Sequence, residues 1–211
     1  MSEAREEILG RIRSALADVP EGSESHVSRE YYRSGTRSPA EVVVLFCERA
    51  ADYRASVRRT TRAEAGGVLA EICAERGAQT LVAPAGLAWA PDGVELVSGE
   101  DLSPADLDAS EGVLTGCALA IAETGTIVLD GGPGQGPRAL TLVPDFHVCV
   151  VEADRIVETV PEGVARMGEA VRASRRPLTL VSGPSATSDI ELSRVEGVHG
   201  PRDLAIVVVE G

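Results

Sequence analysis

The chain has 211 residues, a formal net charge of −13 and no lysine, so its 20 basic residues are all arginines. The acidic balance argues against a nucleic-acid-binding protein, and the lack of lysine excludes Schiff-base chemistry and a lysine-bearing phosphate loop. No apolar run is long enough to span a bilayer and the first ten residues are charged, so we expect a cytoplasmic protein that does not enter a membrane.

The first 37 residues predict a peripheral arm. Ile8, Ile12, Leu16 and Val19 recur at spacings of four, four and three between charged residues, which is the pattern of an amphipathic helix. After Pro20 the chain is rich in Ser, Gly and charge, which indicates a linker. We therefore predict an N-terminal helix and arm over residues 1–37 and one domain over residues 38–211.

Strands and helices alternate through that domain. The predicted helices begin at the capping sequences Ser38-Pro39-Ala40-Glu41, Thr61-Arg62-Ala63-Glu64 and Ser103-Pro104-Ala105-Asp106, and a further helix covers residues 161–173. The hydrophobic fraction of 44% with 3% aromatic residues predicts a core of Val, Leu, Ala and Ile. These features together predict an α/β fold, mainly a parallel sheet with helices on both faces, whose strands cover residues 56–59, 80–83, 94–97, 148–152, 178–181 and 205–209.

The stretch from residue 112 to residue 147 carries the first group of candidate site residues. Glu123, Thr124, Gly125 and Thr126 interrupt two apolar, strand-like segments. A carboxylate in such a place must accept hydrogen bonds from backbone N–H groups, pair with a cation, or face a cleft.

A glycine-rich loop at 131–136 follows the second of those strand-like segments. Residues 134–139 fit the G-x-G-x-x-A dinucleotide fingerprint, but Pro144 leaves too little room for the helix that such a site needs. We interpret the loop as a flap beside a cleft and expect no cofactor. Arg138, which follows it, can hold a carboxylate or phosphate, and the alternative is a structural salt bridge to Glu123.

The second group of candidates follows the strand at 178–181. Hydroxyls and backbone N–H groups gather over residues 182–188, where they can bind an anion at the carboxyl end of a parallel strand, although an ordinary capped connection remains the alternative. Asp189 and Glu191 lack an obvious third ligand, so no metal site is predicted. His199, in a tight turn, is the better acid/base candidate, while His147 opens a buried strand and is expected in the core.

The four cysteines are Cys47, Cys73, Cys117 and Cys149, and no two of them form a C-x-x-C pair. Each lies in an apolar segment, so we interpret them as small buried residues. We expect neither an iron–sulphur cluster nor a structural zinc in this chain.

Two stretches carry a family resemblance. They are AIAETGTIVL with the glycine-rich loop, Arg138 and the Pro144-x-x-His147 step, and later SGPSATSDIE at 182–191 with GVHGP at 197–201. Together they resemble the LUD-domain family, in its lactate-utilisation protein C branch. The resemblance implies a NagB/RpiA/CoA-transferase-like fold and a role as an accessory subunit in oxidation of L-lactate to pyruvate, beside iron–sulphur partner proteins.

We therefore expect a small organic acid or other small anion as ligand, bound in one cleft at the carboxyl edge of the sheet. Glu123 and His199 are the predicted catalytic residues. One alternative is a stand-alone CoA-transferase-like or isomerase-like enzyme with Glu123 as nucleophile or base, and another is a non-catalytic organic-acid-binding module. The residues expected to bind the anion are Thr124, Gly125, Thr126, Arg138, Ser182, Gly183, Ser185, Thr187 and Asp189.

Overall fold

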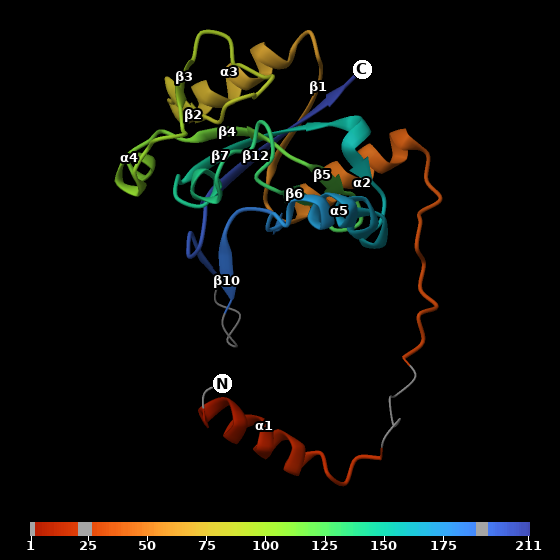
Figure 1. The fold of residues 1–211 in the computed structure, drawn as a ribbon. Coiled ribbons are helices and arrows are strands. Elements are labelled where there is room, and N and C mark those ends of the chain that lie inside the picture. The colour runs from red at the N-terminus through yellow and green to blue at the C-terminus, as the bar shows by residue number, and fades with distance from the viewer. Residues whose placement is uncertain (1–2, 21–26, 189–193) are drawn as a thin grey trace. The chain divides into compact units, whose positions relative to one another are not determined.

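The computed structural model describes residues 3–20, 27–188 and 194–211, and the chain divides into two compact units, residues 1–31 and 32–211 (Figure 1). The first unit contains α1 (Glu3–Ala15), none of whose residues is buried. Its apolar residues stay accessible, with Ile8 58% and Leu16 56% exposed. Among the described residues of this unit, nothing therefore covers the amphipathic stripe that the sequence predicts.

The second unit is built on a six-stranded sheet in which every pairing is parallel. The last strand of the chain, β12, lies between the first strand, β1, and the central strand β7. This arrangement confirms the predicted fold class. In spatial order the strands are β1 (Ser56–Thr61), β12 (Asp203–Glu210), β7 (Phe146–Glu152), β4 (Val113–Gly116), β2 (Thr80–Ala83) and β3 (Glu95–Ser98).

Helices cover both faces of this sheet, as Figure 1 shows for α2 (Pro39–Asp52) and α3 (Ala65–Arg76). Phe46 of α2 belongs to the same apolar cluster as Ile206, whereas Leu69 of α3 clusters with Val207. Because successive strand residues point to opposite faces, the two helices pack on opposite sides of β12. The short helix α4 (Pro104–Asp108) precedes β4.

The helix starts follow local capping chemistry. Ser38 and Glu41 form the predicted capping box at α2, and Ser103 forms one at α4. The box predicted at Thr61 is wrong, because Thr61 is the last residue of β1 and its hydroxyl donates to the Glu64 carboxylate at 2.9 Å. The helix α3 begins only at Ala65.

A second, four-stranded sheet holds much of the polar sequence that the motif stretches contain. The chain reverses at residues 122–125, so β6 runs antiparallel to β5, and β9 pairs antiparallel with β6. The prediction that residues 178–181 join the parallel sheet is therefore wrong. The helix α5 (Val160–Ser174) packs on this sheet through Met167. In spatial order its strands are β8 (Ile156–Val157), β5 (Leu119–Ile121), β6 (Thr126–Leu129) and β9 (Thr179–Val181).

Four small elements complete the second unit. β10 (Ala186–Ser188) and β11 (Arg194–Glu196) form an antiparallel pair. The 3-10 helices η1 (Arg138–Thr141) and η2 (Ala153–Arg155) precede and follow β7. Among the described residues, no helix combines the length and the apolar character needed to cross a membrane.

Residues 35–37, at the start of the second unit, are held in place by hydrogen bonds to two carboxylates, those of Glu158 and Glu162. The Arg37 backbone N–H and guanidinium donate to the Glu158 carboxylate at 2.8 and 2.6 Å, and the Gly35 N–H donates to Glu162 at 3.2 Å. Glu158 is 8% exposed. A buried carboxylate needs such donors, since leaving it without partners costs more than the bonds themselves contribute.

Two truncations test where the arm ends. Removing residues 1–31 is expected to leave the free energy of unfolding of the remaining chain nearly unchanged, because no residue of α1 is buried. Removing residues 1–37 should cost roughly 2 kcal/mol or more, since Glu158 loses the donors of Arg37. Urea unfolding of both truncated proteins measures the difference. Equal stability of the two would contradict a structural role for residues 32–37.

Candidate anion-binding site

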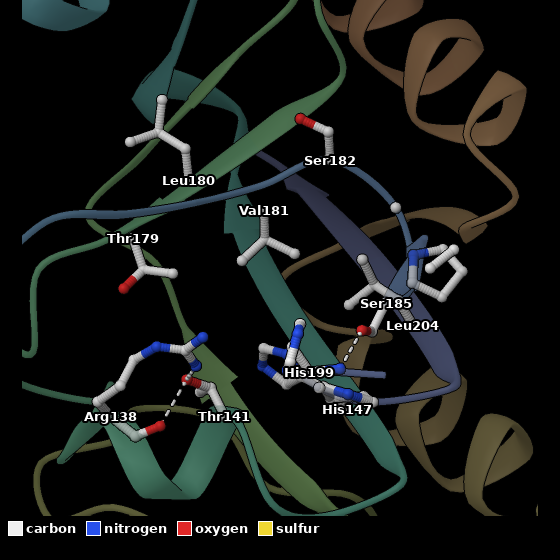
Figure 2. A pocket seen from close by; sticks show the side chains of 15 residues that line it. Arg138, Thr141, His147, Thr179, Leu180, Val181, Ser182, Ser185, His199 and Leu204 are labelled. Atoms are coloured by element: carbon white, nitrogen blue, oxygen red, sulfur yellow. Dashed lines mark hydrogen bonds between the residues drawn. The ribbon is translucent and has the colours of Figure 1, made fainter. Parts of the chain in front are cut away.

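A pocket of about 240 Å³ lies where four segments of the second unit meet. Its walls come from η1, the start of β7, the segment from β9 to Ala186, and the turn before β12. Figure 2 shows the Arg138 guanidinium on one side and His147 and His199 on the other, with Ser182 and Ser185 above and beside them. Several predicted site residues therefore line one pocket, namely Arg138, Ser182, Gly183, Ser185 and His199.

Ser185 joins the two turns that form one wall. Its backbone N–H donates to the Pro201 carbonyl at 2.8 Å, and its carbonyl accepts from the Gly197 N–H at 2.9 Å. Its hydroxyl accepts from the His199 N–H at 3.1 Å. The stretches 182–185 and 197–201, separate in sequence, thus form one hydrogen-bonded wall.

A row of hydroxyls lies beside the pocket, where the second sheet meets the 182–185 turn. The pairing of Ile127 with Val181 places Thr126 beside Ser182, whose hydroxyls lie 2.7 Å apart. Thr124 extends the row, with its hydroxyl 2.7 Å from that of Thr126. Thr126 is 3% exposed and does not line the pocket. Ser182 is among the lining residues, but Figure 2 shows its hydroxyl pointing to the side of Leu180, away from Arg138 and the two histidines.

Arg138 supplies the positive charge. Its guanidinium donates to the Thr141 hydroxyl at 3.2 Å, and within the described part of the chain it has no carboxylate partner. The alternative of a salt bridge to Glu123 is therefore not what the structure shows. Neither Asp nor Glu is among the described residues that line the pocket. An exposed, uncompensated guanidinium beside hydroxyls favours a small anion.

The two histidines differ in their surroundings. His147 is 1% exposed and its Nε2 lies 2.7 Å from the Thr115 hydroxyl. Burial, reinforced by the charge of Arg138, lowers the pKa of His147 to about 4. This imidazole is neutral near pH 7 and adds no positive charge to the pocket. His199 is exposed at the rim.

Sequence reasoning placed His147 in the core, which is correct for its burial, but missed that it also lines the pocket together with Thr141. The sequence did contain a signal for Thr141. Arg138 and Thr141 are three residues apart, so on a 3-10 turn both side chains lie on the same side.

Glu123 lies elsewhere. It is exposed, and its carboxylate accepts the Val160 N–H at 2.6 Å. Val160 is the first residue of α5, whose early N–H groups have no partner within the helix. Glu123 thus caps a helix, and neither it, Thr124 nor Gly125 is among the pocket's lining residues. Of the remaining candidates, the side chain of Thr187 and all of Asp189 lie outside what the structure describes.

The pocket also lies at the opposite edge from the one predicted. His147 and Leu204 are the second residues of β7 and β12, so the pocket is at the amino ends of these parallel strands. The carboxyl-edge rule applies to loops that follow parallel strands. It does not apply to the 182–185 turn, because β9 belongs to the other sheet, where it runs antiparallel to β6.

The glycine-rich loop is held in place rather than projecting as a flap. Asp130 accepts hydrogen bonds from the Gly132 N–H and the Gln135 amide at 2.9 and 2.8 Å, and Gln135 in turn accepts from the Asp130 N–H at 2.8 Å. The loop lines an adjoining pocket of about 250 Å³, which shares Arg138, Thr141 and Thr179 with the first. Arg138 therefore stands between two connected spaces.

The cysteines have the surroundings of buried core residues. Cys73, Cys117 and Cys149 are buried and Cys47 is partly buried. Contact with the Cys117 thiol, and then burial, raises the pKa of the Cys149 thiol, which favours the protonated form over a metal-binding thiolate. Among the residues that the structure describes, no group of three or more His, Cys, Asp or Glu side chains is arranged to hold a metal ion.

The part of the chain that forms these pockets is similar to known proteins. Residues 105–209, which include most of both pockets, match the LUD domain. A Deinococcus radiodurans protein named lactate utilization protein C is 47% identical over 211 residues, covering 99% of this chain and 96% of that protein. The chain belongs to the LUD-domain family, in its lactate utilization protein C branch. The family predicted from the two motif stretches is confirmed.

Two further similarities agree with membership of this chain in the LUD-domain family. A Geobacillus kaustophilus protein, also named lactate utilization protein C, is 28% identical over 170 residues, covering 71% of this chain and 70% of that protein. A crystal structure of a DUF162-family protein from Deinococcus radiodurans has a TM-score of 0.71 and 44% identity, and covers 82% of this chain and 99% of that one.

Substituting Arg138→Ala should weaken binding of small carboxylates by roughly tenfold, about 1.4 kcal/mol. The loss is modest because the guanidinium is exposed at the pocket rim. Calorimetric titration with L-lactate measures it. Arg58→Ala makes the same charge change at a residue that pairs with Glu71 and Glu75 and lines neither pocket. Equal affinity of the Arg138→Ala and Arg58→Ala proteins would rule Arg138 out as the anion anchor.

The low pKa of His147 makes a prediction about stability and pH. In the folded state His147 binds a proton only near pH 4, whereas in the unfolded chain it binds one near pH 6.5. The contribution of His147 to stability is therefore fully present above pH 6.5 and is lost as the pH falls toward 4. Between pH 7 and pH 5 this group alone should remove about 2 kcal/mol. Urea unfolding of His147→Gln should show a shallower dependence of stability on pH than unfolding of the wild type. Identical slopes for the two proteins would contradict this role of His147.

Proposed function

We propose that this protein is an accessory subunit of a cytoplasmic system that oxidises L-lactate to pyruvate, and that the Arg138 pocket binds the organic acid. The observation that carries the proposal is the 47% identity, over nearly the full length of both chains, to a protein named lactate utilization protein C. The geometry supports it, because one guanidinium with nearby hydroxyls suits a monoanion that itself carries a hydroxyl.

The proposed binding mode assigns a role to each wall. The lactate carboxylate pairs with Arg138, which has unused N–H donors beside the bond to Thr141. The lactate hydroxyl meets Ser185, and the methyl group packs toward Val181 and Leu204. Because His147 is neutral near pH 7, it can form a hydrogen bond with the ligand, but it adds no positive charge that would hold a second anion beside the one at Arg138.

The proposal assigns the electrons of the reaction to iron–sulphur partner proteins. Three of the four cysteines here are buried and dispersed along the chain, which does not suit cluster ligation. Of the two alternatives, the CoA-transferase-like or isomerase-like enzyme loses its nucleophile, because Glu123 caps α5 away from the pocket. The non-catalytic organic-acid-binding module uses the same pocket and differs only in that the bound acid is not passed to an oxidising partner.

Growth on L-lactate tests the proposal. A strain deleted for the gene should fail to grow on L-lactate as sole carbon source, and the wild-type gene should restore growth. The Arg138→Ala gene should restore it poorly and the Arg58→Ala gene fully. Undiminished growth of the deleted strain would contradict the proposal, and turnover of acyl-CoA substrates by the purified protein would favour the stand-alone enzyme.

Co-purification distinguishes the subunit from the binding module. The tagged protein, isolated from cells grown on L-lactate, should carry iron–sulphur proteins in a fixed ratio. Isolation of the protein without partners, together with normal lactate binding, would support a binding module instead.

A further inference from the structure

The parallel sheet has a point where its connections diverge. β2 is followed by β3, its neighbour on the outer side, whereas β4 leads by way of the second sheet to β7 on the other side. The loops that leave the carboxyl ends of β2 and β4 therefore run apart. In open α/β sheets such a point leaves a crevice, and ligands bind there.

This crevice is present and is separate from the Arg138 pocket. A pocket of about 160 Å³ opens at these carboxyl ends, and none of its lining residues is shared with the Arg138 pocket or the space adjoining it. Leu87 and Trp89 after β2, Gly116 and Cys117 at the end of β4, and Glu152 and Arg155 after β7 are among its walls. We call it the switch-point crevice.

The glycine-rich loop closes one side of the switch-point crevice. The Gly134 carbonyl accepts from the Gly116 N–H at 2.8 Å, and the Gly134 N–H donates to the Ala85 carbonyl at 3.2 Å. The loop thereby spans the ends of β4 and β2 and presents Pro133 to the crevice. Apolar walls are thus held by backbone hydrogen bonds, so the space is preformed.

The charged side chains that line the switch-point crevice are Glu152 and Arg155. The Glu152 carboxylate pairs with Arg155 at 2.9 Å and with Arg62 at 2.5 Å, so two guanidinium groups share one carboxylate. Arg62 also stacks over the Trp89 ring, 4.6 Å from its centroid. Because Arg62 shares the Glu152 carboxylate, Arg155 is not fully neutralised by Glu152 and can attract an anion.

Arg155 has donors left for such a ligand. A guanidinium carries five N–H donors, and within the described residues Arg155 uses two of its nitrogens, toward Glu152 and toward the Cys117 carbonyl at 3.1 Å. The two contacts fix the direction of the group. The crevice volume of about 160 Å³ is below the roughly 300–1,000 Å³ of sites for drug-sized ligands, which excludes a nucleotide.

We propose that the switch-point crevice is a second binding site, which takes a small aliphatic monocarboxylate. The carboxylate binds Arg155, and the short apolar body lies against Leu87, Trp89 and Pro133. This site does not depend on the function proposed for the Arg138 pocket, because the two spaces lie at opposite ends of β7.

The chain provides its own probe, since Trp89 is its single tryptophan. Titration with propionate should change the Trp89 emission in a saturable way in the millimolar range. Propionamide, a neutral molecule of the same shape, should not. Arg155→Gln should weaken the propionate response at least tenfold, because the charge-assisted bonds are lost.

A second variant tests the body of the crevice rather than its charge. A Cβ added at Gly116 meets its nearest neighbours, the Gly134 and Val150 carbonyls, at 3.8 and 4.0 Å, so Gly116→Ala is expected to fold while reducing the space. It should also weaken the response. Arg138→Gln should leave it unchanged, which separates this site from the first pocket.

The proposal is overturned if propionate gives neither a saturable change in emission nor a saturable calorimetric signal in the Arg138→Gln protein. It is equally overturned if Arg155→Gln responds like the wild type, or if propionamide binds as well as propionate.

Discussion

The position of β12 between β1 and β7 is the constraint on which the rest of the domain depends. Alternate residues of this strand enter two different apolar clusters, Ile206 and Val208 under α2, and Val207 and Val209 under α3. Its register with β7 pairs Leu204 with His147. The same pairing that completes the sheet therefore brings the 138–147 segment against the 197–204 segment and forms the Arg138 pocket. Because these partners are far apart in sequence, neither half of the site can form by itself.

Part of what makes the two motif stretches distinctive is structural. A Cβ on Gly125 would lie 2.4 Å from the Ala50 nitrogen, and one on Gly183 would lie 2.2 Å from the Tyr53 carbonyl, both near the C-terminal end of α2. Both glycines also have positive φ. They allow the second sheet to approach that helix closely, which places Ser182 and its neighbours. Glu123 in the same stretch caps α5. The remaining polar residues, above all Arg138 and Ser185, are those available to a ligand.

The sequence predicted those parts of the fold that have a local signal. Capping residues marked the starts of α2 and α4, and apolar runs marked β7 and β12. The second sheet was not predictable in this way, because β5, β6 and β9 have three or four residues each and their antiparallel pairing depends on the reversal at 122–125. That pairing decides which end of the main sheet receives the 182–185 turn. The edge of the main sheet at which the pocket lies was therefore predicted wrongly. The prediction that Arg138, Ser182, Ser185 and His199 line one pocket agrees with the structure.

The Arg138 pocket, at the amino ends of β7 and β12, is proposed to hold a small organic acid. The most direct test is a crystal structure of the protein with L-lactate. We expect the lactate carboxylate within hydrogen-bond distance of the Arg138 guanidinium and the lactate hydroxyl toward Ser185. Lactate bound at another place with the Arg138 pocket holding only solvent would contradict this assignment.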